Sequence, residues 1–231
     1  MASEGDLKGA SIEIFGGLAG SYDRVLDLAT LLQDRRWKEW VARRLGPERG
    51  LVLDVGSGTL VLEGRMAGRG MRFVGLDLSP QMVGRARTKK AQNVTLLTNA
   101  DAECLPFSDG TFDSVVSCYV PKYVDPRRFA GELARVMRPG GSLILYDFAN
   151  PRGASAPVLR LYVQGGLRFI GAALRLAKRG EASTFRNLPW IIQGTRWDTE
   201  LPRVLEESGF HPVETARLTW GIVFAYWGRR G

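Results

Sequence analysis

Short apolar runs alternate with segments of helical periodicity along most of the chain. Each run is nearly continuous in hydrophobicity and ends at a turn, which is typical of parallel strands buried on both faces. Five such runs predict strands at Leu51–Val55, Arg72–Leu76, Val94–Thr98, Ser114–Cys118 and Ser142–Asp147.

The intervening segments predict helices, because their apolar residues recur at helical spacing. One helix is expected to run from Tyr22 to Leu45 and to stop at Gly46-Pro47. Ser79 and Pro80 are typical of an N-cap and a first helical residue, which predicts a helix to about Lys90. Further helices are predicted at Leu60–Ala67, Pro126–Met137 and Glu200–Ser208.

The C-terminal residues predict a hairpin, with strands at His211–Thr219 and Ile222–Trp227. The whole pattern predicts an α/β fold with a doubly wound, mostly parallel seven-stranded sheet, a C-terminal antiparallel hairpin and a helical insert. We interpret residues 1–231 as a single domain with four parts. These are an N-terminal helical cap (1–47), a cofactor-binding core (48–150), a basic amphipathic insert or lid (151–196) and a C-terminal helix with the hairpin (197–231).

The composition argues against several classes of site. His211 is the single histidine, and Cys104 and Cys118 lack the spacing of metal ligands, so no metal site is expected. No secretory signal pattern begins the chain, and no run of about 18 uncharged apolar residues predicts a membrane span. We therefore expect a cytoplasmic protein.

The net charge of +8 is concentrated in the insert. No acidic residue occurs between Asp147 and Glu181, whereas this interval holds six basic residues. On a helical wheel the bases from Arg160 to Arg179 share an arc of about 100°, and apolar side chains fill the rest. One hypothesis is a lid helix that covers the substrate, and the other adds peripheral contact with an anionic membrane surface.

The strongest chemical signal lies at Leu51–Thr59, where an apolar run leads through Asp54 into the loop Gly56-Ser57-Gly58-Thr59. Asp77 ends the next strand, about twenty residues after the loop, where a carboxylate can reach a ribose. One hypothesis is a nicotinamide or flavin dinucleotide, but that fingerprint needs a third glycine where Val61 stands. The other is S-adenosylmethionine, which lacks a pyrophosphate and needs an acid near its α-amino group, a role that fits Asp54.

Later residues favour the second hypothesis. Asp77 is expected to accept hydrogen bonds from the ribose hydroxyls, with Leu78 beside it. Met82 is a candidate for covering one face of the adenine. Asp101 and Ala102 follow the third strand, where a carboxylate and a backbone N–H can contact the adenine edge.

From Leu51 to Phe148 these landmarks resemble a class I S-adenosylmethionine-dependent methyltransferase, including Arg138–Leu143 before the fifth strand. The flanking segments resemble the ubiquinone/menaquinone-biosynthesis C-methyltransferases. The matching stretches are Phe15, Tyr22-Asp23, Arg35–Lys38, Asp147–Pro151, Asn187–Pro189 and Leu218–Val223. The resemblance implies a Rossmann-like fold and a cofactor site that includes Thr59, Asp77, Asp101, Ala102 and Cys118.

The chain departs from that family at several positions. Leu60 stands where the family usually has a further glycine, Cys118 replaces a serine, and Phe185–Asn187 replaces a tyrosine-rich stretch. Lys122 and Tyr123 occupy the positions of an Arg-Asn pair that the family links to activation of the quinol ring.

Methylation of a ring carbon needs an electron-rich ring, most simply a phenolate. We therefore predict a cation and a tyrosine as the catalytic residues. Lys122 would stabilise the phenolate, and Tyr123 or Tyr22, or else Tyr119, would orient the ring hydroxyl.

The sequence leaves several functions open. The first is methylation of a small lipophilic aromatic acceptor, most simply C-methylation of a demethylmenaquinone-like quinol, and the alternative is a small-molecule N- or O-methyltransferase on the same core. An RNA methyltransferase is disfavoured, because Cys118–Pro121 stands where an Asn/Asp-Pro-Pro-Tyr/Phe signature would lie, and no RNA-binding module is visible, so nucleic acid is not an expected partner. A binding module without turnover is a fourth hypothesis, and the sequence does not determine the oligomeric state.

Overall fold

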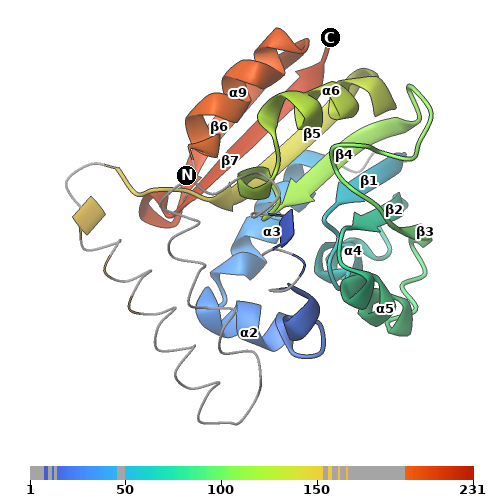
Figure 1. The fold of residues 1–231 in the computed structure, drawn as a ribbon, viewed down its shortest axis with the longest axis vertical. Helices are drawn as coiled ribbons and strands as arrows, with labels where there is room; N and C mark the ends of the chain where they lie inside the picture. Colours follow the sequence, from blue (N-terminus) through green and yellow to red (C-terminus); the bar gives the residue numbers. More distant parts are fainter. Residues whose placement is uncertain are drawn as a thin grey trace.

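The computed structural model describes residues 8, 9, 12, 15–45, 50–152, 156, 157, 161, 165 and 196–231. A seven-stranded sheet in the order β3-β2-β1-β4-β5-β7-β6 runs through this part of the chain (Figure 1). The strands are β1 (Leu51–Val55), β2 (Arg72–Asp77), β3 (Val94–Asn99), β4 (Phe112–Cys118), β5 (Met137–Phe148), β6 (Phe210–Leu218) and β7 (Val223–Arg230).

The sheet has one antiparallel strand, as the C-terminal pattern predicts. Strands β1 to β5 pair in parallel, whereas β7 lies antiparallel to both β5 and β6. The short 3-10 turn Thr219–Gly221 joins the two strands of the hairpin. The predicted doubly wound α/β fold is therefore confirmed.

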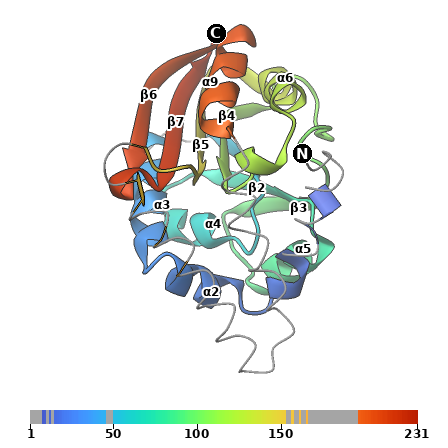
Figure 2. The ribbon, with the colours of Figure 1, turned by 60° about the vertical axis from the view of Figure 1, so that its left-hand side comes forward.

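Helices cover both faces of the sheet. Helices α3 (Gln33–Leu45) and α4 (Val61–Met66) pack on one face, and α6 (Pro126–Val136) and α9 (Trp197–Glu207) pack on the other (Figure 2). Consecutive residues of a strand point to opposite faces, so Val52 joins the core under α3 while Leu53 joins the core under α6. Both cores are needed to bury the central parallel strands.

The N-terminal helix is divided, and the prediction of one helix from Tyr22 to Leu45 is wrong. Helix α2 (Tyr22–Ala29) ends at Thr30, and α3 begins at Gln33. Leu31 and Leu32 adopt positive φ angles of 49° and 63°, which reverse the chain between the two helices. The Thr30 hydroxyl donates to the carbonyl of Leu26 and accepts from the N–H of Asp34, so it bridges both helices.

Other boundaries differ by a few residues. Ser79 is the N-cap of α5 (Pro80–Thr88), as predicted, and its hydroxyl accepts the N–H of Met82. Strand β5 begins at Met137 rather than Ser142, because Met137 already pairs with Phe112 of β4 before a register shift. Helix α9 begins at Trp197, three residues before the predicted start at Glu200.

Most of the predicted insert (151–196) lies outside the described residues, so its basic helical stripe stays a prediction. The division of the chain into cap, core, insert and C-terminal unit likewise stays an interpretation of the sequence. Within the described ranges no helix is both long enough and apolar enough to span a bilayer.

Candidate active site

The glycine loop leaves the carboxyl end of β1 and turns sharply beneath β4. Gly56 has a φ of +79°, and a Cβ added there would lie 2.2 Å from Cγ2 of Val120. Gly58 also has a positive φ, of +53°. The backbone of this loop therefore approaches its neighbours more closely than any side chain would permit.

Asp77 ties the glycine loop to the end of β2. One carboxylate oxygen accepts the N–H of Gly58 at 2.9 Å, and the other accepts the N–H of Ser79 at 2.8 Å. Burial raises the pKa of Asp77, while these two backbone hydrogen bonds act in the opposite direction. A carboxylate oxygen can accept more than one hydrogen bond, and Asp77 lines the adjacent cavity, so its oxygens could also accept ribose hydroxyls.

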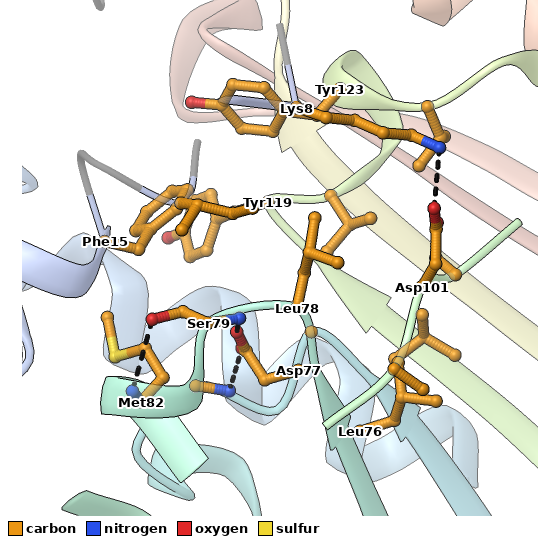
Figure 3. Close-up of a pocket in the computed structure, with 18 of the residues that line it drawn as sticks. Lys8, Phe15, Leu76, Asp77, Leu78, Ser79, Met82, Asp101, Tyr119 and Tyr123 are labelled. Carbon is orange, nitrogen blue, oxygen red and sulfur yellow. Dashed lines mark hydrogen bonds and ion pairs between the residues drawn. The ribbon is translucent and has the colours of Figure 1, made fainter. Parts of the chain in front are cut away.

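A cavity with about 690 Å³ of empty space, part of it open to solvent, lies at the carboxyl ends of the first four strands. In Figure 3, Ser79 and Met82 lie on the opposite side of this cavity from Phe15, Tyr119 and Tyr123, and Asp101 lies at its edge next to Lys8. The predicted residues that line it are Tyr22, Gly56, Gly58, Asp77, Leu78, Met82, Asp101, Ala102, Cys118 and Tyr123.

A smaller cavity adjoins the first and contains the other predicted cofactor residues. Asp54, Ser57 and Thr59 line it, and it shares Gly56, Gly58 and Cys118 with the larger cavity. The structure thus brings every predicted cofactor-binding residue to one continuous region, although their contacts with a cofactor stay a prediction. The thiol of Cys118 is buried in the shared wall, and desolvation raises its pKa well above the ordinary value.

Asp23 fixes the glycine loop from outside the core. It accepts the hydroxyl of Thr59 on one oxygen, and it accepts Lys89 Nζ on the other at 2.6 Å. Helix α2 is therefore tied both to the glycine loop and to the end of α5, which explains why the Tyr22-Asp23 pair occurs beside the cofactor residues.

Lys122 does not face the cavity, contrary to what a direct phenolate contact requires. Its Nζ donates to Asp147 at 2.6 Å and to the carbonyl of Tyr119 at 3.0 Å, and its side chain is 2% exposed. Burial lowers the pKa of Lys122, and Asp147 opposes that shift. The ammonium instead lies 4.4 Å from the ring centroid of Tyr123.

Aromatic side chains form one wall of the cavity, and Tyr22 and Tyr119 of this wall also line the smaller cavity at the glycine loop. Phe15 packs edge-to-face against Tyr22 and Tyr123, with centroid distances of 6.0 and 5.8 Å. Burial raises the pKa of both tyrosines, and nearby carboxylates act in the same direction, so both hydroxyls stay protonated. The hydroxyl of Tyr123 is buried and has no hydrogen-bond partner among the described residues.

A buried network holds Tyr119 in this wall. Its hydroxyl donates to Asp34 at 2.6 Å, and Asp34 also accepts both Lys38 and the hydroxyl of Tyr146. The backbone of Tyr119 has a φ of +67°, an uncommon conformation for an aromatic residue. Strained residues of this kind often occur at functional sites.

Sequence reasoning named Tyr22 as a site residue but missed Lys8. Lys8 donates to Asp101 at 2.8 Å and forms an ion pair with Glu103 at 2.7 Å, although it lies 93 residues before Asp101. Phe15, Lys38 and Ser79 also line one of the two cavities. Phe15 and Lys38 lie in stretches that resemble the family and Ser79 is a predicted cap, whereas the contact of Lys8 joins segments far apart in the sequence and had no local signal. No cluster of three or more His, Cys, Asp or Glu side chains suited to a metal occurs in the described ranges.

Comparison with known proteins identifies the chain. A family model described as a methyltransferase domain matches residues 53–145. The demethylmenaquinone methyltransferase of Tropheryma whipplei (strain Twist) is 34% identical over 224 residues, covering 95% of this chain and 91% of that protein. The demethylmenaquinone methyltransferase of Thermus thermophilus is 32% identical, covering 94% of this chain and 100% of that protein.

The solved structures agree on the fold. A chain in the complex between the Haloferax volcanii Trm112 methyltransferase activator and the putative methyltransferase superposes with a TM-score of 0.63 at 21% identity. The matched region covers 93% of this chain and 96% of that chain. The sheet order, the glycine loop and these matches define a methyltransferase that depends on S-adenosylmethionine. The sequence similarity extends over nearly the whole length, and the chain belongs to the demethylmenaquinone methyltransferase family.

Proposed function

We propose that this enzyme transfers a methyl group from S-adenosylmethionine to a ring carbon of a demethylmenaquinone-like quinol. The observation that carries the proposal is the aromatic wall of the cavity, formed by Phe15, Tyr22, Tyr119 and Tyr123 next to the acidic residues predicted for the cofactor. The names of the family members support the same acceptor class.

The residues present fit the cofactor. Asp77 would hold the ribose, and Asp54 would face the methionine α-ammonium from the smaller cavity. Met82 and Ala102 would contact the adenine, with Asp101 at its edge once the ammonium of Lys8 is displaced or shared.

When bound, the cofactor supplies an activated methyl on a sulfonium sulfur for an in-line displacement. The aromatic wall would hold the quinol ring with its carbon in line with that methyl and would exclude water. The protonated hydroxyls of Tyr22 and Tyr123 would donate to the ring oxygen and stabilise the phenolate form of the acceptor.

Lys122 takes a different role in this proposal from the one its sequence position suggests. Because Asp147 and the Tyr119 carbonyl occupy its ammonium, it would support the ring of Tyr123 from behind rather than contact the acceptor. It is therefore a positioning residue rather than a catalytic one.

The position of Lys122 also favours the alternative function. An enzyme that methylates nitrogen or oxygen of a small aromatic acceptor needs no strong stabilisation of a carbanion-like ring. The described part of the cavity offers tyrosine hydroxyls and no unpaired cation at the aromatic wall, since Lys122 is bound to Asp147.

The test is incubation with methyl-labelled S-adenosylmethionine and reduced demethylmenaquinone, followed by extraction and determination of the methyl position. We expect label in the organic phase on ring carbon, with at least a tenfold loss of kcat in Y123F and unchanged cofactor affinity. Label on oxygen or nitrogen would establish the alternative, and label confined to water would exclude both acceptor classes.

We also propose that the enzyme contacts anionic membranes peripherally through the basic insert, because a quinol with a lipid tail is found in bilayers. The cluster of bases between residues 152 and 179 supports this contact. Sedimentation with phosphatidylglycerol vesicles should remove the protein from solution at low salt, whereas phosphatidylcholine vesicles should not. Equal sedimentation with both would contradict an electrostatic contact.

A further inference from the structure

Two carboxyl groups lie together beneath the glycine loop. Asp54 is the last residue but one of β1 and is 3% exposed, while Glu63 on α4 is fully buried. Asp54 lines the smaller cavity, whereas Glu63 is not one of its lining residues. No assigned function uses Glu63, and a buried carboxyl group without a role is costly to a fold.

These two groups must share a proton. No N–H or hydroxyl of the described residues donates to Asp54 Oδ1 or to either carboxyl oxygen of Glu63. The two side chains are nevertheless within hydrogen-bonding reach of each other. Two carboxylates cannot satisfy one another, so one of them must be protonated and must donate to the other.

The surroundings assign the proton to Glu63. Burial raises the pKa of Glu63 well above its ordinary value, and Asp54 adds to the shift. Burial raises the pKa of Asp54 to about 7, with the hydrogen bond from Glu63 and the charge of Lys38 acting to lower it. The other titratable groups facing Asp54 are Asp77 on β2, which raises its pKa, and the thiol of Cys118 on β4.

We propose that Glu63 is a positioning residue of the cofactor site, a neutral acid that donates to Asp54 and holds this carboxylate ionised and oriented toward the cofactor's α-ammonium. The inference rests on the assignment of Asp54 in the proposed function and adds a second acid to it. A carboxylic acid kept neutral by burial can serve as a donor of this kind. Cofactor binding then favours ionised Asp54 and releases the proton that Asp54 holds at lower pH.

The test measures the affinity for S-adenosylhomocysteine, which carries the same α-ammonium, by calorimetry from pH 6 to 8. For the natural enzyme we expect affinity to rise with pH and to level off above pH 7, near the value of Asp54. In E63M no donor remains, so the midpoint should move up by about one unit and the affinity at pH 7 should fall about fivefold. In E63Q the amide still donates, and the affinity should stay within about threefold.

The titration of the ligand is the same for all variants. Each difference between their pH profiles therefore bears on the proposal. An E63M profile that coincides with the natural one would overturn it, and so would equal losses in E63Q and E63M. E39Q, at an exposed glutamate of α3, is the matched control and should not change the profile.

A second measurement does not depend on the folding of any variant. The binding heat of the natural enzyme at pH 6.5 should differ between buffers of different ionisation enthalpy, because a proton is released. A buffer-independent heat would contradict the inference. Normal proton release without methyl transfer to quinol would reject only the acceptor, whereas absence of any binding would reject the cofactor assignment of Asp54.

Discussion

Single residues set the shape of the cofactor site, and Gly56 shows this most directly. Its φ of +79° and the approach of Val120 leave no room for a Cβ. Any larger residue would have to push back either the loop or the start of the turn after β4, and both line the cavity.

Replacement of Gly56 by alanine should therefore lower both stability and cofactor affinity. We expect G56A to lose about 1–3 kcal/mol of unfolding free energy and at least tenfold in affinity for S-adenosylhomocysteine. Gly64 on α4 is the matched control, because a Cβ there would meet nothing within 4 Å. G64A should bind normally and unfold at slightly higher denaturant concentration, and a G56A enzyme that also binds normally would refute the steric argument.

The buried acids predict a pH dependence of stability. The folded-state pKa values of Asp54 and Glu63 lie above those of the unfolded chain, so the folded state binds more protons above about pH 4.3. The free energy of unfolding should consequently fall as pH rises, by up to about 1.4 kcal/mol per pH unit for each proton.

E63Q removes one of these protons, so its stability relative to the natural enzyme should increase steadily from pH 5 to 8. Urea denaturation at several pH values measures the difference. E39Q should show no such trend. A constant difference between E63Q and the natural enzyme would mean that Glu63 is already ionised in the folded state.

At the scale of elements, the break between α2 and α3 decides where Tyr22 and Asp23 lie. Thr30, Leu31 and Leu32 turn the chain so that α3 packs on the sheet while α2 reaches the glycine loop. A single straight helix would carry one of these two segments away from the core. Leucine is a poor residue for positive φ, because its Cβ then crowds the following carbonyl.

Glycine at this break should therefore be tolerated. We expect L32G to keep its stability within about 0.5 kcal/mol, because relief of the left-handed conformation offsets the added freedom of the unfolded chain. Leu28 is equally exposed but lies within α2, so L28G should lose about 1 kcal/mol. Equal losses in the two variants, measured by urea denaturation, would contradict the role of backbone strain at the break.

Across the whole molecule, the cavity draws on residues from Lys8 to Val124 and on the ends of four parallel strands. The C-terminal hairpin contributes no residue to either cavity, and it completes both cores by covering the edge of β5. The strands whose ends line the cavity thus serve binding, whereas the C-terminal hairpin serves stability.

Ligand binding should stabilise the entire fold, because the cavity exists only when these segments are assembled. S-adenosylhomocysteine at one hundred times its Kd should raise the unfolding free energy by about 2.7 kcal/mol. A nicotinamide dinucleotide should produce no change, and D77N should lose most of the response. Stabilisation by the dinucleotide alone would contradict the cofactor assignment.

The sequence by itself determined the strands and the sheet class, and it marked the acids predicted for the cofactor site. These follow from local patterns, since a buried parallel strand must be apolar throughout and its turn must carry the glycines and acids. We could therefore predict Asp54, Asp77 and Asp101 from their positions along the chain.

Only the tertiary structure decided the rest. The burial of Lys122 against Asp147 and the contact of Lys8 with Asp101 join distant elements, and the pairing of Asp54 with Glu63 joins β1 to the helix that follows the glycine loop. The direction of each side chain depends on what packs around it. A local sequence pattern shows whether a residue is polar or apolar, but not which residue it contacts. Long-range contacts form between segments whose sequences do not constrain each other.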